Sequence, residues 1–298
     1  MRRSALTVAL VLASSTAWAD ITCVVGFGPG GASSRIAQHV CQVFGEELGV
    51  KAHVENQPGA GGLNAIRHVL EHGKDGKTVL LFASTSTLKL KPGELTPVAQ
   101  VSRSDFVFVQ KDGLSSRTLS EFFDVMRSDE SLQTYMTPGA GTIPHLAMVE
   151  IVKREKIPMR HVPSKGSNSA AIDVMGGHVS GVLIAFSDAI APIQKGLRPL
   201  FVTSAKRSEK LPDVPTLLEL GYDIDTAGWH AILVHPETPL RLFVQYDGAI
   251  SFAAEKMPPA LIELGFRGEY ATSKEVYAQH SRDYDRWTKV AKDLGITP

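Results

Sequence analysis

The sequence predicts an α/β fold in which two lobes are joined by two chain crossings. Strand-like apolar runs alternate with helix-like stretches twice along the 298-residue chain, a pattern typical of parallel sheets with helices on their faces. The chain is long enough for two hydrophobic cores. A strand-like run at residues 227–234 indicates a return to the first lobe. We expect a ligand cleft between the lobes, where strand ends meet.

The first lobe is predicted to begin with alternating strands and helices. Short apolar runs predict its strands, and apolar positions that recur at helical spacing predict its helices. Gly49 follows the longest helical stretch, at a position where helices commonly end. The expected elements are strands at residues 21–26, 51–55 and 78–83, helices at 31–48 and 63–72, and two strand pieces within 97–110 that are interrupted at 102–105.

A second series of strands and helices predicts the second lobe. It is followed by a return strand and a tail that is expected to be mostly helical, with Trp287 in the core. The expected elements are helices at residues 119–127, 145–156 and 169–175, strands at 134–137, 159–162, 179–185 and 200–203, the return strand at 227–234, and the tail at 243–294.

The N-terminus has the pattern of a secretory signal peptide. Two arginines precede an apolar stretch at residues 5–13, and the small residues Ala17 and Ala19 stand at the cleavage-site positions. The apolar stretch is too short to span a bilayer as a helix. We therefore expect residues 1–19 to be removed and the mature protein to be exported, soluble and periplasmic.

The charge balance argues against nucleic acid or an anionic membrane surface as a partner. The chain has 31 Lys and Arg against 31 Asp and Glu. Loss of the two arginines of the signal peptide leaves 29 basic against 31 acidic side chains, a net charge of −2 with neutral histidines. No long basic run offers a stripe for phosphates.

Two cysteines, Cys23 and Cys41, would face an oxidising compartment after export. A disulfide between the first strand and the first helix requires matched Cβ directions, which a sequence does not reveal. A disulfide and two buried free thiols therefore remain open as alternatives.

Two glycine-rich turns, one in each expected lobe, are the candidate ligand-binding features. The first contains Gly26-x-Gly28-x-x-Gly31 after a strand, which matches a dinucleotide-binding pattern. The second, at residues 137–145, has the sequence TPGAGTIPH. Both lead into a helix, whose N-terminus presents free N–H groups and the positive end of its dipole to an anion. One such turn in each lobe favours an anion-binding cleft over two tight connections.

Six segments give the chain a resemblance that covers nearly the whole mature length. They are GFGPGGASSR at 26–35, VENQPGAGG at 54–62, GAGTIPHLA at 139–147, VPSKGS at 162–167, GGHVSGV at 176–182 and, as the most specific, VTSAKRSEKLPDVPTLLELGY at 202–222. With these segments the chain resembles the extracytoplasmic solute receptors of tripartite tricarboxylate transporters, also called the Bug family.

The resemblance implies a two-lobed periplasmic-binding fold of the Venus-flytrap kind (type II), with a small organic carboxylate between the lobes. Lobe 1 would comprise residues 20–102 and 229–298, and lobe 2 residues 103–228. The resemblance implies a monomer without cofactor, metal or catalysis. Its partners would be transporter membrane subunits or, as the alternative, a sensor kinase of a two-component system. Carried over by position, the expected ligand-binding residues are Phe27, Gly28, Pro29, Gly30, Gly31, Ala32, Ser33, Ser34, Ser84, Thr85, Ser86, Thr137, Gly139, Ala140, Gly141, Thr142 and His145.

Departures from the family pattern bear on the ligand. Gly26 and Gly28 stand where the family commonly has prolines, so we interpret the dinucleotide pattern as accidental. Ser34 stands where many members have Asp, and this loss of a counter-charge for an ammonium group disfavours an amino acid. Ser164 in place of a tyrosine, and a shortened segment after Thr87, leave room for a ligand bulkier than a four-carbon acid.

Two other patterns suggest catalysis and are set aside. HVLEH at residues 68–72 matches a zinc-peptidase pattern, but a third ligand is not evident and a solvated helix end accounts for the histidines. His145 follows a turn that carries hydroxyls, but the sequence has no G-x-S-x-G elbow. A secreted hydrolase and a dinucleotide-binding enzyme are therefore only remote alternatives.

Overall fold

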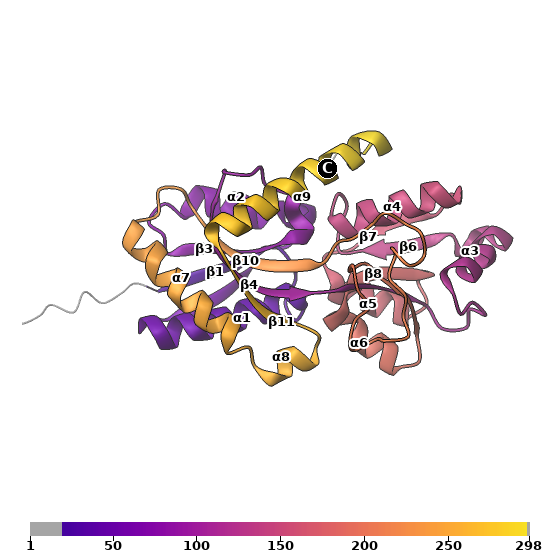
Figure 1. Cartoon of the computed structure of the whole chain (residues 1–298), viewed down its shortest axis with the longest axis horizontal. Helices are drawn as coiled ribbons and strands as arrows, with labels where there is room; N and C mark the ends of the chain where they lie inside the picture. The colour runs from indigo at the N-terminus through magenta and orange to yellow at the C-terminus, as the bar shows by residue number, and fades with distance from the viewer. Residues whose placement is uncertain (1–19, 297–298) are drawn as a thin grey trace, which may run out of the picture.

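The computed structural model describes residues 20–296, and it confirms the two-lobed α/β fold (Figure 1). Each lobe has its own sheet, and the two lobes follow one another along the long axis of the molecule. Helices flank both sheets. The expected signal peptide at residues 1–19 lies outside the described residues.

The first lobe is built on a six-stranded sheet with the order β11-β4-β10-β3-β1-β2. Strand β1 pairs in parallel with β2 and β3, as the alternation of strands and helices predicted. Strand β10 pairs antiparallel with β3 and β4, and β11 pairs antiparallel with β4. The strands are β1 (Ile21–Val25), β2 (Ala52–Asn56), β3 (Thr78–Ala83), β4 (Thr96–Ser104), β10 (Gly228–Val234) and β11 (Arg267–Thr272).

The helices of the first lobe carry clear local end signals. Gly49 ends α1 in a left-handed conformation with φ 66°. The last helix, α9, begins with a capping box in which the Thr272 hydroxyl accepts from the Glu275 backbone and the Glu275 side chain accepts in return. The helical elements are α1 (Ala32–Leu48), α2 (Leu63–His72), α7 (Leu240–Glu255), α8 (Pro259–Glu263) and α9 (Ser273–Leu294), with the 3-10 segments η1 (Ala60–Gly62) and η2 (Ser84–Lys89).

The second lobe is built on a five-stranded sheet with the order β7-β6-β8-β5-β9. Strand β6 pairs in parallel with β7 and β8, and β5 pairs antiparallel with β8 and β9. Its strands are β5 (Phe106–Gln110), β6 (Thr134–Thr137), β7 (Arg160–Pro163), β8 (Gly181–Ala185) and β9 (Arg198–Val202). Its helical elements are α3 (Leu119–Ser128), η3 (Glu130–Leu132), α4 (Ile143–Glu155), α5 (Ser167–Met175) and α6 (Phe186–Gln194).

The chain first passes between the sheets at Asp105. Strand β4 ends just before Asp105 and strand β5 begins just after it. The break expected over residues 102–105 is therefore a single residue. Asp105 is buried, and its carboxylate accepts two hydrogen bonds of 3.2 Å from the guanidinium of Arg267 on β11. This ion pair ties the crossing to the edge of the first sheet. The chain returns to that sheet where β10 begins at Gly228.

The tail at residues 243–294 is mostly helical, as expected, but it also contains strand β11, which was not predicted. Of the residues of β11 only Ala271 is even partly buried, because the strand lies at the edge of the sheet. A short edge strand with polar side chains lacks the apolar signal from which strands are predicted.

Cys23 and Cys41 are both free and buried. Cys23 lies on β1 and Cys41 on the buried face of α1. A hydrogen bond with Cys41, together with burial, raises the pKa of the Cys23 thiol. Of the two alternatives that the sequence left open, the structure contains the buried free thiols.

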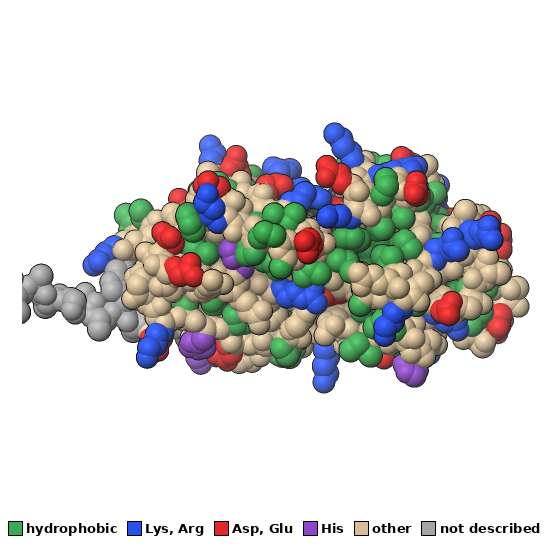
Figure 2. Space-filling view, turned by 90° about the horizontal axis from the view of Figure 1, so that it is seen from below, with side chains coloured by type: hydrophobic (Ala, Val, Ile, Leu, Met, Phe, Trp, Pro, Cys, Tyr) green, Lys and Arg blue, Asp and Glu red, His purple; other side chains and the backbone are tan. Residues whose placement is uncertain are grey.

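The surface has mixed charge. On the face shown in Figure 2, basic and acidic side chains are interspersed over both lobes. Within residues 20–296, none of the helices combines the length and the apolar character needed to cross a membrane.

Phe108 on β5 provides a test of packing in the hydrophobic core of the second lobe. We expect Phe108→Ala to lower the free energy of unfolding by about 3–5 kcal/mol, because the ring of Phe108 stacks on Phe201 with centroids 5.2 Å apart and meets Phe122 edge-on at 5.2 Å. Urea denaturation would measure the loss. Val244→Ala on α7 is the control, since Val244 is 62% exposed and should change stability by no more than about 0.5 kcal/mol. An equal loss of unfolding free energy in both variants would contradict the placement of Phe108 in this core.

Candidate functional site

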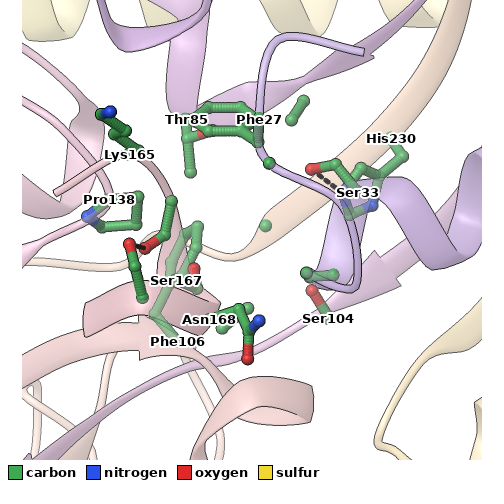
Figure 3. A pocket seen from close by; sticks show the side chains of 18 of the residues that line it. Phe27, Ser33, Thr85, Ser104, Phe106, Pro138, Lys165, Ser167, Asn168 and His230 are labelled. Carbon is green, nitrogen blue, oxygen red and sulfur yellow. Dashed lines mark hydrogen bonds between the residues drawn. The ribbon is translucent and has the colours of Figure 1, made fainter. Parts of the chain in front are cut away.

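A cavity of about 220 Å³ lies between the lobes (Figure 3). From the first lobe it is lined by the turn after β1, the start of η2 and the start of β10. From the second lobe it is lined by the turn before α5, the beginning of α5 and residues at the start of β5 and the end of β8. It therefore lies where ligand clefts of α/β lobes are expected, at the ends of strands.

The turn between β1 and α1 forms one wall of the cavity. Gly26 accommodates a close backbone approach, because a Cβ there would lie 2.7 Å from the Cα of Gly62. Helix α1 has no side-chain cap, so the N–H groups of its first turn lack helical partners. The N–H of Ala32 donates to a carboxylate oxygen of Asp188 at 3.2 Å. Within residues 20–296, the neighbouring N–H of Ser33 makes no hydrogen bond.

The turn between β7 and α5 forms the opposite wall. Gly166 has φ 145°, a region that favours glycine, and a Cβ there would lie 3.6 Å from the Cβ of Phe27. The N–H of Gly28 donates to the carbonyl of Lys165 at 3.4 Å, so the two turns touch. Helix α5 also lacks a side-chain cap, and its first residues line the cavity. The positive ends of two helix dipoles, one from each lobe, therefore meet at this cavity.

A buried histidine forms part of the cavity floor. The ring of His230 on β10 hydrogen bonds to the hydroxyl of Ser33 at 3.2 Å and to that of Ser102 at 3.1 Å (Figure 3 shows the contact with Ser33). Burial lowers the pKa of His230 to about 4. The ring is therefore neutral near pH 7, and it orients Ser33 without adding a charge to the cavity.

The start of η2 contributes two hydroxyls with different roles. The hydroxyl oxygen of Ser84 accepts a hydrogen bond from the backbone N–H of Trp229 at 3.0 Å, which links η2 to β10. The hydroxyl of Thr85 is buried, lines the cavity and has no hydrogen-bond partner within the described residues. Since an unpaired buried hydroxyl is costly, Thr85 is available to a polar group of a ligand.

The second glycine-rich turn lies outside the cavity, apart from Pro138. It leads into α4, whose start packs against η1 and η2 rather than against α1. A Cβ on Gly139 would lie 3.3 Å from the Cα of Gly61, so the two backbones are already in contact.

His145 closes the second turn on itself. Its Nδ1 accepts the N–H of Gly141 at 3.0 Å, and its ring lies against that of His161 with centroids 3.9 Å apart. Burial and then the nearby charge of Lys89 lower the pKa of His145 to about 4. Burial and then His145 lower the pKa of His161 to about 3. Both rings are thus neutral near pH 7 and offer no charge to an anion.

The structure divides the sequence-predicted site residues into two groups. Those that line the cavity are Phe27, Gly28, Pro29, Gly31, Ala32, Ser33, Ser84 and Thr85. Those that do not line it are Gly30, Ser34, Ser86, Thr137, Gly139, Ala140, Gly141, Thr142 and His145. Ser34, for example, turns away and accepts a hydrogen bond from the Asn56 amide at 3.3 Å.

Sequence reasoning missed the part of the cavity that the second lobe and the crossings supply. A signal was present in VPSKGS at 162–167, where a glycine and hydroxyl residues precede a helical stretch. The lining residues not predicted are Ala83, Ser104, Phe106, Pro138, Lys165, Gly166, Ser167, Asn168, Ser169, Ile172, Ala185, Gly228, Trp229 and His230.

A sequence model of the tripartite tricarboxylate transporter family receptors matches residues 36–296. The chain belongs to this receptor family. BugT of Bordetella pertussis is 26% identical over 290 residues, covering 92% of this chain and 89% of BugT. A UPF0065 protein of Cupriavidus necator is 30% identical over 315 residues, covering 98% of this chain and 95% of that protein.

Solved structures agree with this receptor fold. The periplasmic binding protein BugD superposes with a TM-score of 0.85 at 22% identity, covering 93% of this chain and 98% of BugD. A Rhodopseudomonas palustris protein solved with adipate superposes with a TM-score of 0.84 at 24% identity, covering 94% of this chain and 98% of that protein. Family and fold are those of solute-binding receptors.

In this receptor Asp188 links the two lobes beside the cavity. It lies on α6 and accepts the N–H of Ala32, and its other oxygen lies 3.3 Å from the guanidinium of Arg35 on α1. That second contact is an ion pair without hydrogen-bond geometry. Burial raises the pKa of Asp188 to about 6, although Arg35 and the Ala32 N–H oppose the shift. The buried carboxylate of Asp188 thus takes up a proton more readily than an exposed carboxylate would.

The zinc-like pattern on α2 brings two histidine rings together. The rings of His68 and His72 lie 4.6 Å apart. Across residues 20–296, no group of three or more His, Cys, Asp or Glu side chains is placed to hold a metal ion.

We expect Asp188 to make ligand affinity depend on pH. When the lobes separate, water reaches Asp188 and its pKa returns toward 3.8, so the closed state binds the proton more tightly. Below pH 6 this favours closure, and the advantage is absent at pH 7. From pH 7 to pH 5 we expect affinity for an acid that stays ionised to rise by about tenfold in the wild type relative to Asp188→Asn. Calorimetric titration would measure the ligand affinity of both proteins across this pH range. Parallel pH profiles of the two affinities would exclude Asp188 as the cause of the pH dependence.

Proposed function

We propose that this protein is an exported periplasmic receptor that captures a small organic carboxylate between its lobes and delivers it to a tripartite tricarboxylate-type transporter. One observation carries the proposal: the N-termini of α1 and α5, whose N-cap glycines supply no capping side chain, converge on one cavity. At α1 the Asp188 carboxylate takes the N–H of Ala32. The cavity also contains the hydroxyl of Thr85, which has no partner within the described residues. Free N–H groups and aligned dipoles bind a carboxylate without a basic side chain. Family membership supports the transporter as partner.

Each lobe supplies half of the carboxylate site in this proposal. From lobe 1 come the N–H and hydroxyl of Ser33, which His230 holds in place, and the hydroxyl of Thr85. From lobe 2 come the first-turn N–H groups of α5, beginning at Ser167. A ligand that contacts both halves stabilises the closed arrangement, in which Gly28 meets Lys165. The closed protein then presents a surface made from both lobes to the transporter membrane subunits.

The carboxylate itself can be tested by thermal shift. Ligands that bind only the folded state raise the melting temperature by mass action. Organic acids should raise it, whereas neutral sugars and amino acids should not. Stabilisation by sugars or amino acids in the absence of any effect of organic acids would refute the proposed ligand class.

Thr85→Val tests whether the unpartnered hydroxyl binds the ligand. Loss of one hydrogen bond of about 0.5–1.5 kcal/mol should weaken an acid that stabilises the wild type by about two- to tenfold. Thr238→Val is the matched control, because the Thr238 hydroxyl is also buried without a partner but Thr238 does not line the cavity. Calorimetry should show weaker binding only for Thr85→Val, and equal affinities of the two variants would remove Thr85 from the site.

Closure can be measured by small-angle scattering. Because a wedged ligand makes contacts with both lobes, we expect the radius of gyration to fall when a tight acid is added. Profiles that coincide with and without saturating ligand would argue that the lobes do not close on it.

A further inference from the structure

We propose that the ligand is a monocarboxylate with an apolar body, and that the cavity discriminates against dicarboxylates of the same length. This inference rests on the proposed function, since it concerns the same cavity. It follows from the distribution of charge and apolar surface around the cavity.

The two helix starts that can bind an anion lie beside one another at the cavity. The turn that begins α1 and the turn that begins α5 touch through Gly28 and Lys165. A Cβ on Gly31 would lie 3.8 Å from the Cβ of Asn168, so the two helix starts are neighbours. Two dipoles that point at one place make a single anion site rather than two.

The rest of the lining is largely apolar. The rings of Phe106 and Trp229 line it, together with Ala185, Pro138 and Ile172. Trp229 directs its ring N–H away from the cavity, to the carboxylate of Asp283 at 3.1 Å. A hydrocarbon chain or an aromatic ring of a ligand would therefore replace water against this surface favourably.

The cavity lacks a buried counter-charge for a second carboxylate. Among its lining residues in the described chain, Lys165 carries the only cationic side chain. Lys165 is exposed, and in Figure 3 its ammonium end points away from Ser33 and His230. His230 is neutral because burial lowers its pKa to about 4. Arg35, next to α1, is paired with Asp188 and does not line the cavity.

A second carboxylate would thus leave water without a buried cation to pair with. Such burial of an uncompensated charge is strongly unfavourable. The size of the cavity fits a small acid: at about 30 Å³ per water, its 220 Å³ correspond to roughly seven water molecules. Hexanoate and adipate share one carbon skeleton and differ by one carboxylate, so they isolate the effect of the second charge.

The first experiment compares hexanoate, benzoate, adipate and hexanol by calorimetry at pH 7.5. We expect hexanoate or benzoate to bind at least about tenfold more tightly than adipate, with hexanol weaker than both monocarboxylates. Adipate that binds more tightly than hexanoate and benzoate would overturn this inference and leave the proposed function intact. Hexanol that matches hexanoate while adipate fails would instead overturn the carboxylate site itself.

The second experiment supplies the missing charge. Ile172 on α5 lines the cavity and is 58% exposed, so Ile172→Arg can place a guanidinium beside the cavity without disturbing the core. We expect this variant to reduce the ratio of hexanoate affinity to adipate affinity by at least about fivefold. Ile172→Gln controls for the shape change. Leu240→Arg on α7, where Leu240 is 76% exposed and outside the cavity, controls for net charge.

The outcome of the second experiment is decided by the ratio of the two affinities. A change in Ile172→Arg that is absent from Ile172→Gln and Leu240→Arg supports a missing counter-charge as the basis of selection. An unchanged ratio in a folded Ile172→Arg variant, or an equal change in Leu240→Arg, contradicts it.

Discussion

The contact between two backbone turns is the constraint on which the site depends. The N–H of Gly28 reaches the carbonyl of Lys165, and Gly166 packs on Phe27 where a side chain would be strained. This approach places the start of α1 beside the start of α5. Helix dipoles act only within about the first turn, so the two helices can share one ligand only when their ends are this close.

The ionisable side chains next to these turns are either paired with an opposite charge, as Asp188 is with Arg35, or neutral, as His230 is. Asp188 takes one N–H of α1 and pairs with Arg35, and His230 stays neutral between two serines. Near pH 7 the cavity therefore depends on backbone N–H groups and hydroxyls, because Lys165, its one cationic lining residue in the described chain, is exposed. We propose that such a site recognises a single carboxylate and that Asp188, which bridges the lobes, couples recognition to closure.

The fold was largely predictable because its signals are local. Apolar runs, helical spacing and end signals such as Gly49 are contained in short stretches of sequence, and they predicted both α/β lobes. Strand β11 was missed because its exposed, polar residues carry no apolar pattern, and only pairing with β4 makes it a strand. The narrow break at Asp105 likewise depends on its distant partner, Arg267.

The sequence by itself determined the alternation of elements, the glycine-rich turn before α1, and the residues of that turn that line the cavity. Only the tertiary structure decided which turn of the second lobe faces it. Two turns of that lobe, at residues 137–145 and 162–167, have glycine and hydroxyl residues before a helix, so local composition does not separate them. Helix α4 packs against η2 and the turn before α4 packs against η1, which brings Gly139 onto Gly61, and α5 is left facing α1. Contacts between residues far apart in sequence therefore determine which turn of the second lobe faces the cavity.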